Sequence, residues 1–251
     1  MLALAPARLN PPAEEATQGA MMFDATGLDA FYGEPIGQAT RRLILRRVRA
    51  AWPDLRGQRV LGYGFAVPYL RTMLGEAERV IALMPPQHGT IAWPEQPLVA
   101  MSDEEALPFP DALFDRILMV HGLESAESLR SLMRQIWRVL APGGRLMAIA
   151  PNRTSLWAQV ERSPFAQGRP FSRSQLDRLM REAMFQPERW DTALYAPPLR
   201  FRRPRGNGWE SVGRRLWPAF AGVHLVEATK SLYALAPPAK GERARATLAK
   251  A

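Results

Sequence analysis

Residue types that can bind a ligand or move a proton are predicted to gather at one edge of a sheet. A turn that contains Gly62 and Gly64 follows a short apolar segment typical of a buried strand, and glycine lets backbone approach a ligand closely. Three later segments with strand patterns end near Asp103, His121 and Asn152. Ligands of open α/β sheets bind where the carboxyl ends of parallel strands meet. The spacing therefore predicts a ligand site that these residues surround.

Proton transfer and substrate positioning are the chemistry expected at this edge. His121 ends a predicted strand, where an imidazole that titrates near neutral pH can take a proton from an attacking nucleophile. The simpler interpretation is that His121 hydrogen-bonds the following loop and holds it in place. Asn152 can orient a substrate, although a Pro-Asn pair is also common in turns. His88 and His224 lack carboxylate or histidine neighbours at ligand spacing, so no zinc or iron site is expected.

Alternating helical and strand patterns predict the elements that hold this edge together. Apolar residues recur at helical spacing in segments 36–52, 68–74, 125–140 and 172–183. In addition to the strand before Gly62, buried strands are predicted at 79–84, 91–101, 115–120 and 145–150. Two further strands are predicted at 189–195 and 223–235. The pattern predicts a Rossmann-like, doubly wound α/β fold, with a mostly parallel seven-stranded sheet and an antiparallel C-terminal strand pair.

Length and composition bound the domain organisation. The chain has 251 residues, of which 47% are hydrophobic, and it can bury the core of one large domain. Residues 1–22 lack periodicity and are predicted to form a flexible leader, and residues 238–251 a flexible tail. The domain itself is predicted to span residues 23–237, with a basic insertion at 197–220.

Charge and cysteine content bear on partners and compartment. The formal net charge is +9, and arginines from Arg200 to Arg215 cluster with Trp209 and Trp217. Such a cluster can follow the phosphates of a nucleic acid, but we favour a solvated insertion because no single-strand binding module surrounds it. The absence of cysteine excludes disulfides and thiolate metal sites, and it fits a cytoplasmic protein. No apolar stretch reaches the length of a membrane-spanning helix, so no membrane partner is expected.

Two segments downstream of the glycine turn resemble a known family. One is Leu107-Pro-Phe-Pro110, and the other is Arg138-Val-Leu-Ala-Pro-Gly-Gly144. In combination they resemble the class I S-adenosylmethionine-dependent methyltransferases, in particular the type 11 group, over roughly residues 55–152. The resemblance implies a Rossmann-like fold and S-adenosylmethionine as the cofactor. It also implies transfer of a methyl group to an acceptor that the sequence does not identify.

The resemblance assigns places in the cofactor site to the first loop and the second strand. The family has an acid and three glycines in the first loop, and an acid at the end of the second strand binds the ribose hydroxyls. In this chain Gly62 stands at the place of the loop acid, and Gly64 matches the first glycine. Ala66 and Pro68 replace the other two glycines. Met84 stands where the ribose-binding acid is expected.

Four further residues complete the cofactor site that the resemblance implies. Asp103 corresponds to the acid that contacts adenine, with Leu107 beside the ring, although Asp103 can instead cap the turn at 103–106. The ring of Tyr63, in the first loop, can fill space where the cofactor lies. Tyr32 is expected either to belong to an N-terminal lid over the cofactor or to pack on the sheet like other amphipathic aromatic residues.

The leading hypothesis for function is a methyltransferase that uses S-adenosylmethionine and acts on an unidentified acceptor. A lost ribose carboxylate removes hydrogen bonds worth about 1.5 to 3 kcal/mol each. This loss motivates the alternative of a catalytically inactive, methyltransferase-like module that binds a protein partner. A third alternative, a dinucleotide-binding oxidoreductase, rests on Gly62 and Gly64 and is weaker because Val67 stands at the third glycine.

Overall fold

The computed structural model describes residues 24–91, 93, 98–160, 163–198 and 208–231. The leader predicted at 1–22 and the tail predicted at 238–251 lie outside these residues, as do Arg200 to Arg205 of the predicted insertion. Arg214 and Arg215 are described and are exposed. The nucleic-acid alternative for this segment stays a prediction.

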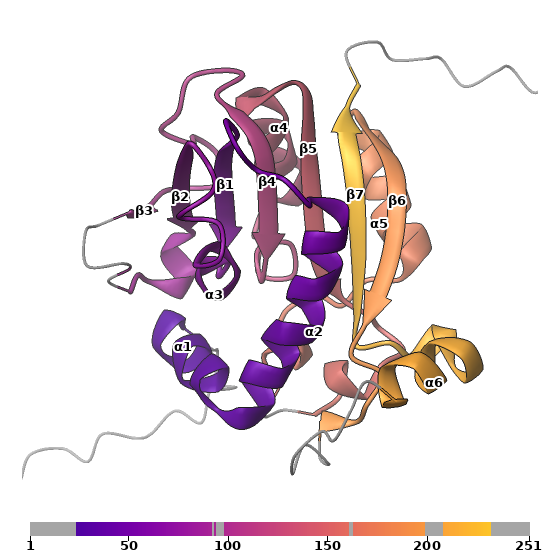
Figure 1. The fold of residues 1–251 in the computed structure, drawn as a ribbon. Coiled ribbons are helices and arrows are strands. Elements are labelled where there is room, and N and C mark those ends of the chain that lie inside the picture. The colour runs from indigo at the N-terminus through magenta and orange to yellow at the C-terminus, as the bar shows by residue number, and fades with distance from the viewer. Residues whose placement is uncertain (1–23, 92, 94–97, 161–162, 199–207, 232–251) are drawn as a thin grey trace, which may run out of the picture.

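The described residues form a seven-stranded sheet at the centre of the molecule (Figure 1). The strands are β1 (Arg59–Gly64), β2 (Arg79–Met84), β3 (Val99–Met101), β4 (Phe114–Val120), β5 (Leu140–Pro151), β6 (Phe185–Ala193) and β7 (Val223–Lys230). Their order across the sheet is β3-β2-β1-β4-β5-β7-β6. The first five strands are parallel, and β7 is antiparallel to both of its neighbours. The predicted fold class is therefore confirmed.

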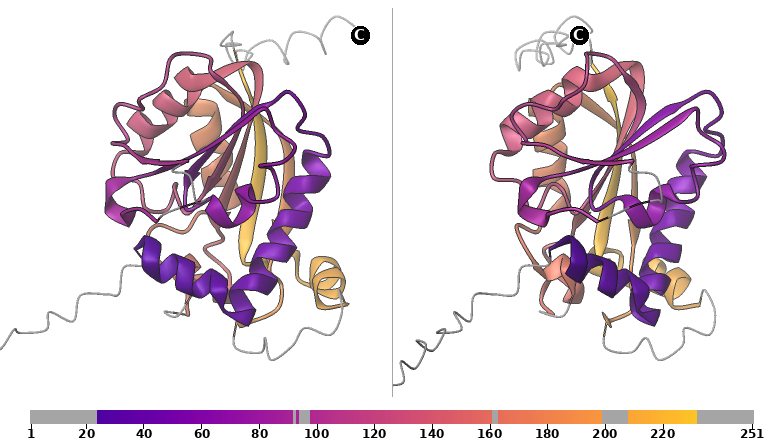
Figure 2. Two further views of the ribbon diagram at one scale, coloured as in Figure 1. Left: turned by 60° about the vertical axis from the view of Figure 1, so that its left-hand side comes forward. Right: turned by 90° about the vertical axis from the view of Figure 1, so that its left-hand side faces the viewer.

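Helices cover both faces of the sheet, with α2 on one face and α4 and α5 on the other (Figure 2). The helices are α1 (Ala25–Gly33), α2 (Pro35–Ala51), α3 (Val67–Leu70), α4 (Leu129–Val139), α5 (Arg173–Glu182) and α6 (Gly208–Leu216). Short 3-10 turns are η1 (Pro86–His88), η2 (Leu156–Ala158), η3 (Pro164–Ala166) and η5 (Pro218–Phe220). Helix α1 lies across the carboxyl ends of β1 and β4 (Figure 1). Among the described residues, no helix is long and apolar enough to cross a bilayer.

Strand side chains alternate between two apolar layers, as the pleat of a strand requires. In β1, Val60 packs into the layer that α1, α2 and α3 cover, whereas Leu61 packs into the layer under α4 and α5. In β4, Leu118 belongs to the first layer and Met119 to the second. Both faces of the parallel strands are therefore buried, which explains their nearly continuous apolar sequences.

Several predicted boundaries were wrong for identifiable local reasons. The helix predicted at 68–74 ends at Leu70, and turns follow it. The strand predicted at 91–101 is reduced to β3, although residues 92 and 94–97 are not described. Helix α4 begins at Leu129, because the side chain of Ser128 caps it and accepts a hydrogen bond from the backbone N–H of Ser131. The spacing of apolar residues in the sequence did not predict helix α1.

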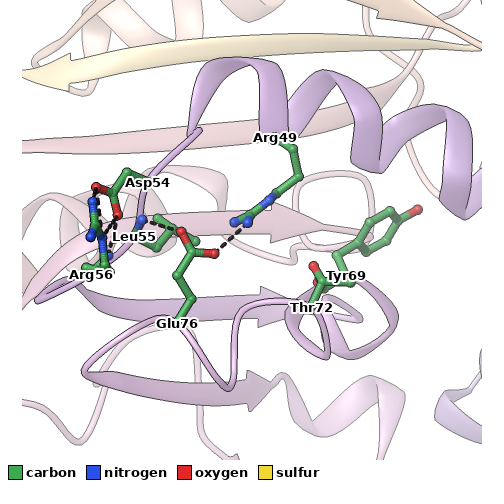
Figure 3. Close-up of polar contacts among 7 residues, drawn as sticks. All are labelled: Arg49, Asp54, Leu55, Arg56, Tyr69, Thr72 and Glu76. Atoms are coloured by element: carbon green, nitrogen blue, oxygen red, sulfur yellow. Dashed lines mark hydrogen bonds and ion pairs between the residues drawn. The ribbon is translucent and has the colours of Figure 1, made fainter.

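The connection from α2 into β1 is fixed by one carboxylate (Figure 3). Glu76, in the segment before β2, accepts a hydrogen bond from the backbone N–H of Leu55 at 2.7 Å and pairs with the guanidinium of Arg49. The hydrogen bond from Arg49 holds the pKa of Glu76 below its usual value. The same view shows Thr72, whose hydroxyl donates to the carbonyl of Tyr69 at 3.1 Å. These bonds help to place the start of β1 and the end of α3.

Candidate active site

A pocket of about 280 Å³ lies at the edge of the sheet where the parallel strands end. This volume is close to the lower end of the range of roughly 300 to 1,000 Å³ found for small-molecule sites. Helix α1 and the segments after β2, β4 and β5 supply its walls. The lining residues are Leu28, Gln87, His88, His121, Glu124, Ser125, Ala126, Glu127, Pro164, Gln167, Gly168 and Arg169. The predicted place of the ligand site therefore holds a pocket.

A chain of buried hydrogen bonds runs from this pocket to helix α3. Nδ1 of His121 lies 3.1 Å from Oε1 of Glu124, and Nε2 lies 2.9 Å from the hydroxyl of Tyr32. That hydroxyl lies 2.9 Å from the hydroxyl of Tyr69. A carboxylate can only accept, so it favours the tautomer of His121 that carries hydrogen on Nδ1 and leaves Nε2 to accept from Tyr32. His121 is thereby oriented from both sides.

Burial keeps the two phenols of this chain protonated. It raises the pKa of Tyr32 well above its ordinary value, and the neighbouring Tyr69 raises it further. Burial also raises the pKa of Tyr69. The ring of Tyr32 stacks on Phe65 with centroids 5.9 Å apart, and His121 packs against Phe165 at 4.8 Å. Tyr32 thus joins α1 to the end of β4 by both packing and hydrogen bonding.

Three polar atoms in residues that line the pocket have no hydrogen-bond partner among the residues that the structure describes. They are Oε1 of Gln87, Nδ1 of His88 and Oε2 of Glu124. Burial lowers the pKa of His88 to about 4, with the charge of His121 adding to the effect, so His88 is neutral at neutral pH. A buried polar atom without a partner costs free energy. This side of the pocket is therefore suited to a ligand that supplies hydrogen bonds.

The glycines of the turn after β1 make close packing contacts within the protein. Gly64 has φ of +76°, and a Cβ atom there would lie 2.3 Å from the carbonyl oxygen of Val120. A Cβ atom on Gly62 would lie 2.5 Å from Cδ1 of Leu70. Ala66 is buried, and its carbonyl accepts from the first turn of α3. The structure therefore gives Gly62, Gly64 and Ala66 roles in packing, where cofactor contact was predicted.

Three aromatic or apolar residues predicted at the cofactor are part of the core. Met84 is 0% exposed and belongs to the apolar layer that also contains Trp93. Tyr63 is buried in the opposite layer, and its hydroxyl has no partner among the described residues. Leu107 packs in that same layer. None of these three side chains lines the pocket.

The acid predicted at adenine has the alternative role that the sequence left open. Asp103 is exposed, and its carboxylate accepts from the backbone N–H of Glu105 at 2.9 Å, which caps the local turn. The next residue, Glu104, is buried and accepts from the backbone N–H groups of Glu127 and Ser128. Glu104 thus anchors the loop that precedes α4.

Asn152 makes structural hydrogen bonds, and the positioning role expected for it stays a prediction. Its amide nitrogen donates to the carbonyls of Ala219 and Ala221, at 2.8 Å in both cases. Its amide oxygen accepts from the backbone N–H of Thr154. Asn152 therefore joins the end of β5 to the segment before β7, outside the pocket lining.

Of the residues predicted from sequence, His121 is the one that lines the pocket. Tyr32 does not line it but hydrogen-bonds His121. Sequence reasoning missed Gln87, His88 and Glu124. His88 was set aside because it is far from His121 in sequence, whereas β2 and β4 flank β1 in the sheet and bring their loops together. A search for polar residues within four positions of each predicted strand end would have found all three.

Removing the Tyr32 hydroxyl tests whether the hydrogen-bonded chain stabilises the fold. Tyr32→Phe deletes two buried hydrogen bonds and leaves Nε2 of His121 without its partner, so we expect a loss of about 1 to 3 kcal/mol in the free energy of unfolding. Tyr63→Phe is the matched control, because its buried hydroxyl has no described partner and its loss should be neutral or stabilising. Urea denaturation measures both. Equal effects of the two substitutions would contradict this account.

The comparison with protein families agrees with this architecture. Residues 61–148 match a family model described as a methyltransferase domain, of type 11. This stretch is similar to type 11 methyltransferase domains over about a third of the chain. Its bounds run from within β1 to within β5, and they include the loops after β2 and β4 that supply the pocket.

Proteins of known sequence match this chain over a short stretch. The ubiquinone/menaquinone biosynthesis C-methyltransferase UbiE of Pectobacterium carotovorum is 44% identical over 48 residues, which is 19% of this chain and 19% of that protein. The protein of the same name from Laribacter hongkongensis is 39% identical over 51 residues, or 20% of this chain and 21% of that protein. The match thus spans about a fifth of these curated relatives.

Solved structures resemble the fold of this chain over most of its length. A SAM-dependent methyltransferase from Thermotoga maritima has a TM-score of 0.59 and 22% identity, covering 82% of this chain and 95% of that one. A SAM-dependent methyltransferase from Archaeoglobus fulgidus has a TM-score of 0.57 and 18% identity, covering 76% and 94%. At this identity the likeness shows the fold.

S-adenosylmethionine, the cofactor that the sequence resemblance implies, can be compared with the chemistry of the pocket. The cofactor presents an ammonium group and two ribose hydroxyls, all of which donate hydrogen bonds. The pocket offers the free carboxylate oxygen of Glu124, the amide oxygen of Gln87 and the imidazole of His88. Among the described residues these buried groups have no hydrogen-bond partner, and a ligand with such donors would supply one.

Proposed function

We propose that this protein is an S-adenosylmethionine-dependent methyltransferase that acts on an acceptor still to be identified. The observation that supports this function best is the set of three polar atoms around the pocket that have no partner in the described part of the chain. All three belong to residues within the stretch that matches the methyltransferase model. The pocket lies beyond the carboxyl ends of the parallel strands, where ligands of open α/β sheets bind. The stretch shared with the curated relatives is too short to assign their acceptor to this chain.

Some residues of the pocket would bind the cofactor, and another would accept a proton. When bound, the cofactor supplies a methyl group already activated by a sulfonium, so the protein mainly aligns the acceptor and excludes water. Glu124 would hold the positively charged ammonium end through Oε2. Its other oxygen, Oε1, contacts Nδ1 of His121 at 3.1 Å and would orient the imidazole.

His121 is the group that would take the proton an acceptor loses. It lines the pocket, is 3% exposed, and has a carboxylate on Nδ1 and the Tyr32 phenol on Nε2. The cofactor would supply the methyl group and leave as the thioether S-adenosylhomocysteine, and the proton that the acceptor loses would pass to Nε2 of His121. Before the acceptor binds, the Tyr32 hydroxyl would hydrogen-bond Nε2 of His121. The Tyr69 hydroxyl in turn hydrogen-bonds that of Tyr32. The charge that develops on His121 would be balanced by Glu124.

Isothermal titration with S-adenosylmethionine and S-adenosylhomocysteine tests the proposed function. We expect binding of both ligands with micromolar dissociation constants. Glu124→Gln keeps the shape of the side chain but removes its charge, so affinity should fall about 10-fold or more because a charge-assisted hydrogen bond is lost. A folded wild-type protein that gives no heat at millimolar ligand would overturn the proposal and favour an inactive, methyltransferase-like binding module.

A further inference from the structure

The end of β2 cannot supply a carboxylate to a ribose. Met84 ends this strand, is 0% exposed and packs in the apolar layer with Trp93. Its backbone carbonyl accepts from the N–H of Ser102 at 3.2 Å, so the main chain there is also occupied. A bound nucleoside would need other partners for its two ribose hydroxyls on this side of the sheet, because unpaired hydroxyls in a buried site weaken binding.

Polar groups appear on the same segment immediately after this strand. Gln87 and His88 lie in the 3-10 turn η1, and both line the pocket. His88 is 6% exposed, and its Nδ1 has no hydrogen-bond partner among the described residues. Oε1 of Gln87 is buried and equally unpartnered within the described part of the chain. Gln87 and His88 thus each place a buried polar atom at this pocket that has no hydrogen-bond partner among the described residues.

The backbone of this turn is held in place before any ligand binds. The N–H of His88 donates to the carbonyl of Pro85 at 3.0 Å, and the N–H of Gly89 donates to the carbonyl of Pro86, also at 3.0 Å. Proline at both positions fixes φ, and Gly89 with φ of +69° ends the turn. A preorganised turn loses less entropy when a ligand binds.

The position of η1 in the sheet order determines which part of a ligand it meets. Strand β1 lies between β2 and β4, so the pocket extends from η1 on the β2 side to His121 and Glu124 on the β4 side. Glu124 presents a carboxylate oxygen that has no partner among the described residues, which suits a cationic group. Gln87 and His88 present uncharged groups, which suit hydroxyls. The two sides thus match the two ends of one ligand, an amino acid end and a nucleoside end.

We propose that Gln87 and His88 bind the ribose hydroxyls of S-adenosylmethionine, in place of an acid at the end of β2. This inference rests on the proposed function. The amide oxygen of Gln87 accepts from one hydroxyl, and Nδ1 of His88 pairs with the other. Because a hydroxyl both donates and accepts, either tautomer of a neutral His88 makes this bond. The subsite is therefore specific for a ribose with both hydroxyls free.

Calorimetry with a matched pair of ligands tests this subsite. The ligands are S-adenosylhomocysteine and its 2′,3′-dideoxy analogue, which lacks both ribose hydroxyls. We expect the wild-type protein to bind the dideoxy analogue about 10-fold or more weakly, as the loss of two uncharged hydrogen bonds predicts. In Gln87→Leu and His88→Phe the preference for the free hydroxyls should shrink, because the analogue has fewer bonds left to lose.

His224→Leu is the matched control, because it replaces a buried histidine of β7 that does not line the pocket. This variant should keep the wild-type preference. If the wild-type protein binds neither ligand, the proposed function fails. If it binds S-adenosylhomocysteine and both pocket variants keep the full preference, the ribose subsite is refuted while the proposed function stands. Thermal unfolding monitors each variant, and Gln87→Leu carries the test if His88→Phe does not fold, because Gln87 is only partly buried.

Discussion

Gly64→Ala is expected to lower the free energy of unfolding by about 3 kcal/mol or more. Two costs add at this position. The backbone has φ of +76°, where an L-residue is strained by roughly 1 to 2 kcal/mol. The new Cβ would also lie 2.3 Å from the carbonyl oxygen of Val120, which already accepts from the N–H of Phe65 at 2.7 Å. The clash must be relieved by separating the ends of β1 and β4, which costs about another 1 to 3 kcal/mol.

Gly57→Ala is the matched control for Gly64→Ala. Gly57 has a similar φ of +68°, but nothing lies within 4 Å of a Cβ built on it. Its replacement should cost only the backbone strain of about 1 to 2 kcal/mol. Urea denaturation followed by circular dichroism measures both variants. If Gly64→Ala is no less stable than Gly57→Ala and loses only cofactor affinity, then Gly64 serves the ligand and the packing role is wrong.

Acid is expected to destabilise the protein through two buried histidines. Burial lowers the pKa of His224 to about 4, and the charge of Arg173 adds to the effect. Burial lowers the pKa of His88 to about 4 as well. The unfolded chain takes up these protons near pH 6.5, so stability is greatest above pH 6.5 and falls until about pH 4. Between pH 6.5 and pH 4, each histidine lowers the free energy of unfolding by about 3 kcal/mol.

His224→Leu isolates one of these contributions. Neither ring nitrogen of His224 has a hydrogen-bond partner in the described part of the chain, so an apolar side chain removes a titrating group without breaking a described bond. Between pH 7 and pH 4, the free energy of unfolding of the variant should fall by about 3 kcal/mol less than that of the wild-type protein. Guanidinium denaturation at a series of pH values gives the two curves. Parallel curves over the whole range would show that His224 does not titrate in this way.

Much of the fold was predictable because the relevant forces are local or periodic. The limits of β2 agree with the predicted strand, since a short apolar run between Arg79 and Pro85 is typical of a parallel strand that is buried on both faces. Ser172 was predicted to cap α5, and it forms a capping box with Gln175. These features depend on a few neighbouring residues, so the sequence alone contains them.

The site was less predictable because its residues meet through the order of the strands. Gly64 looked like a ligand-binding glycine, and only the distance to Val120 shows that it permits two strand ends to approach each other. His88 and Glu124 come from loops on opposite sides of β1. No spacing rule within one segment relates them, whereas the electrostatic effect of Glu124 on the pKa of His88 follows directly from the fold.

The pocket between η1 and Glu124 is the central element of this account, and a crystal structure with S-adenosylhomocysteine tests it most directly. We predict electron density for the ligand with its ribose beside Gln87 and His88 and its amino group within hydrogen-bond distance of Oε2 of Glu124. Density for the ribose against Met84 and Phe65, with Gln87 and His88 left without ligand contacts, would contradict the account.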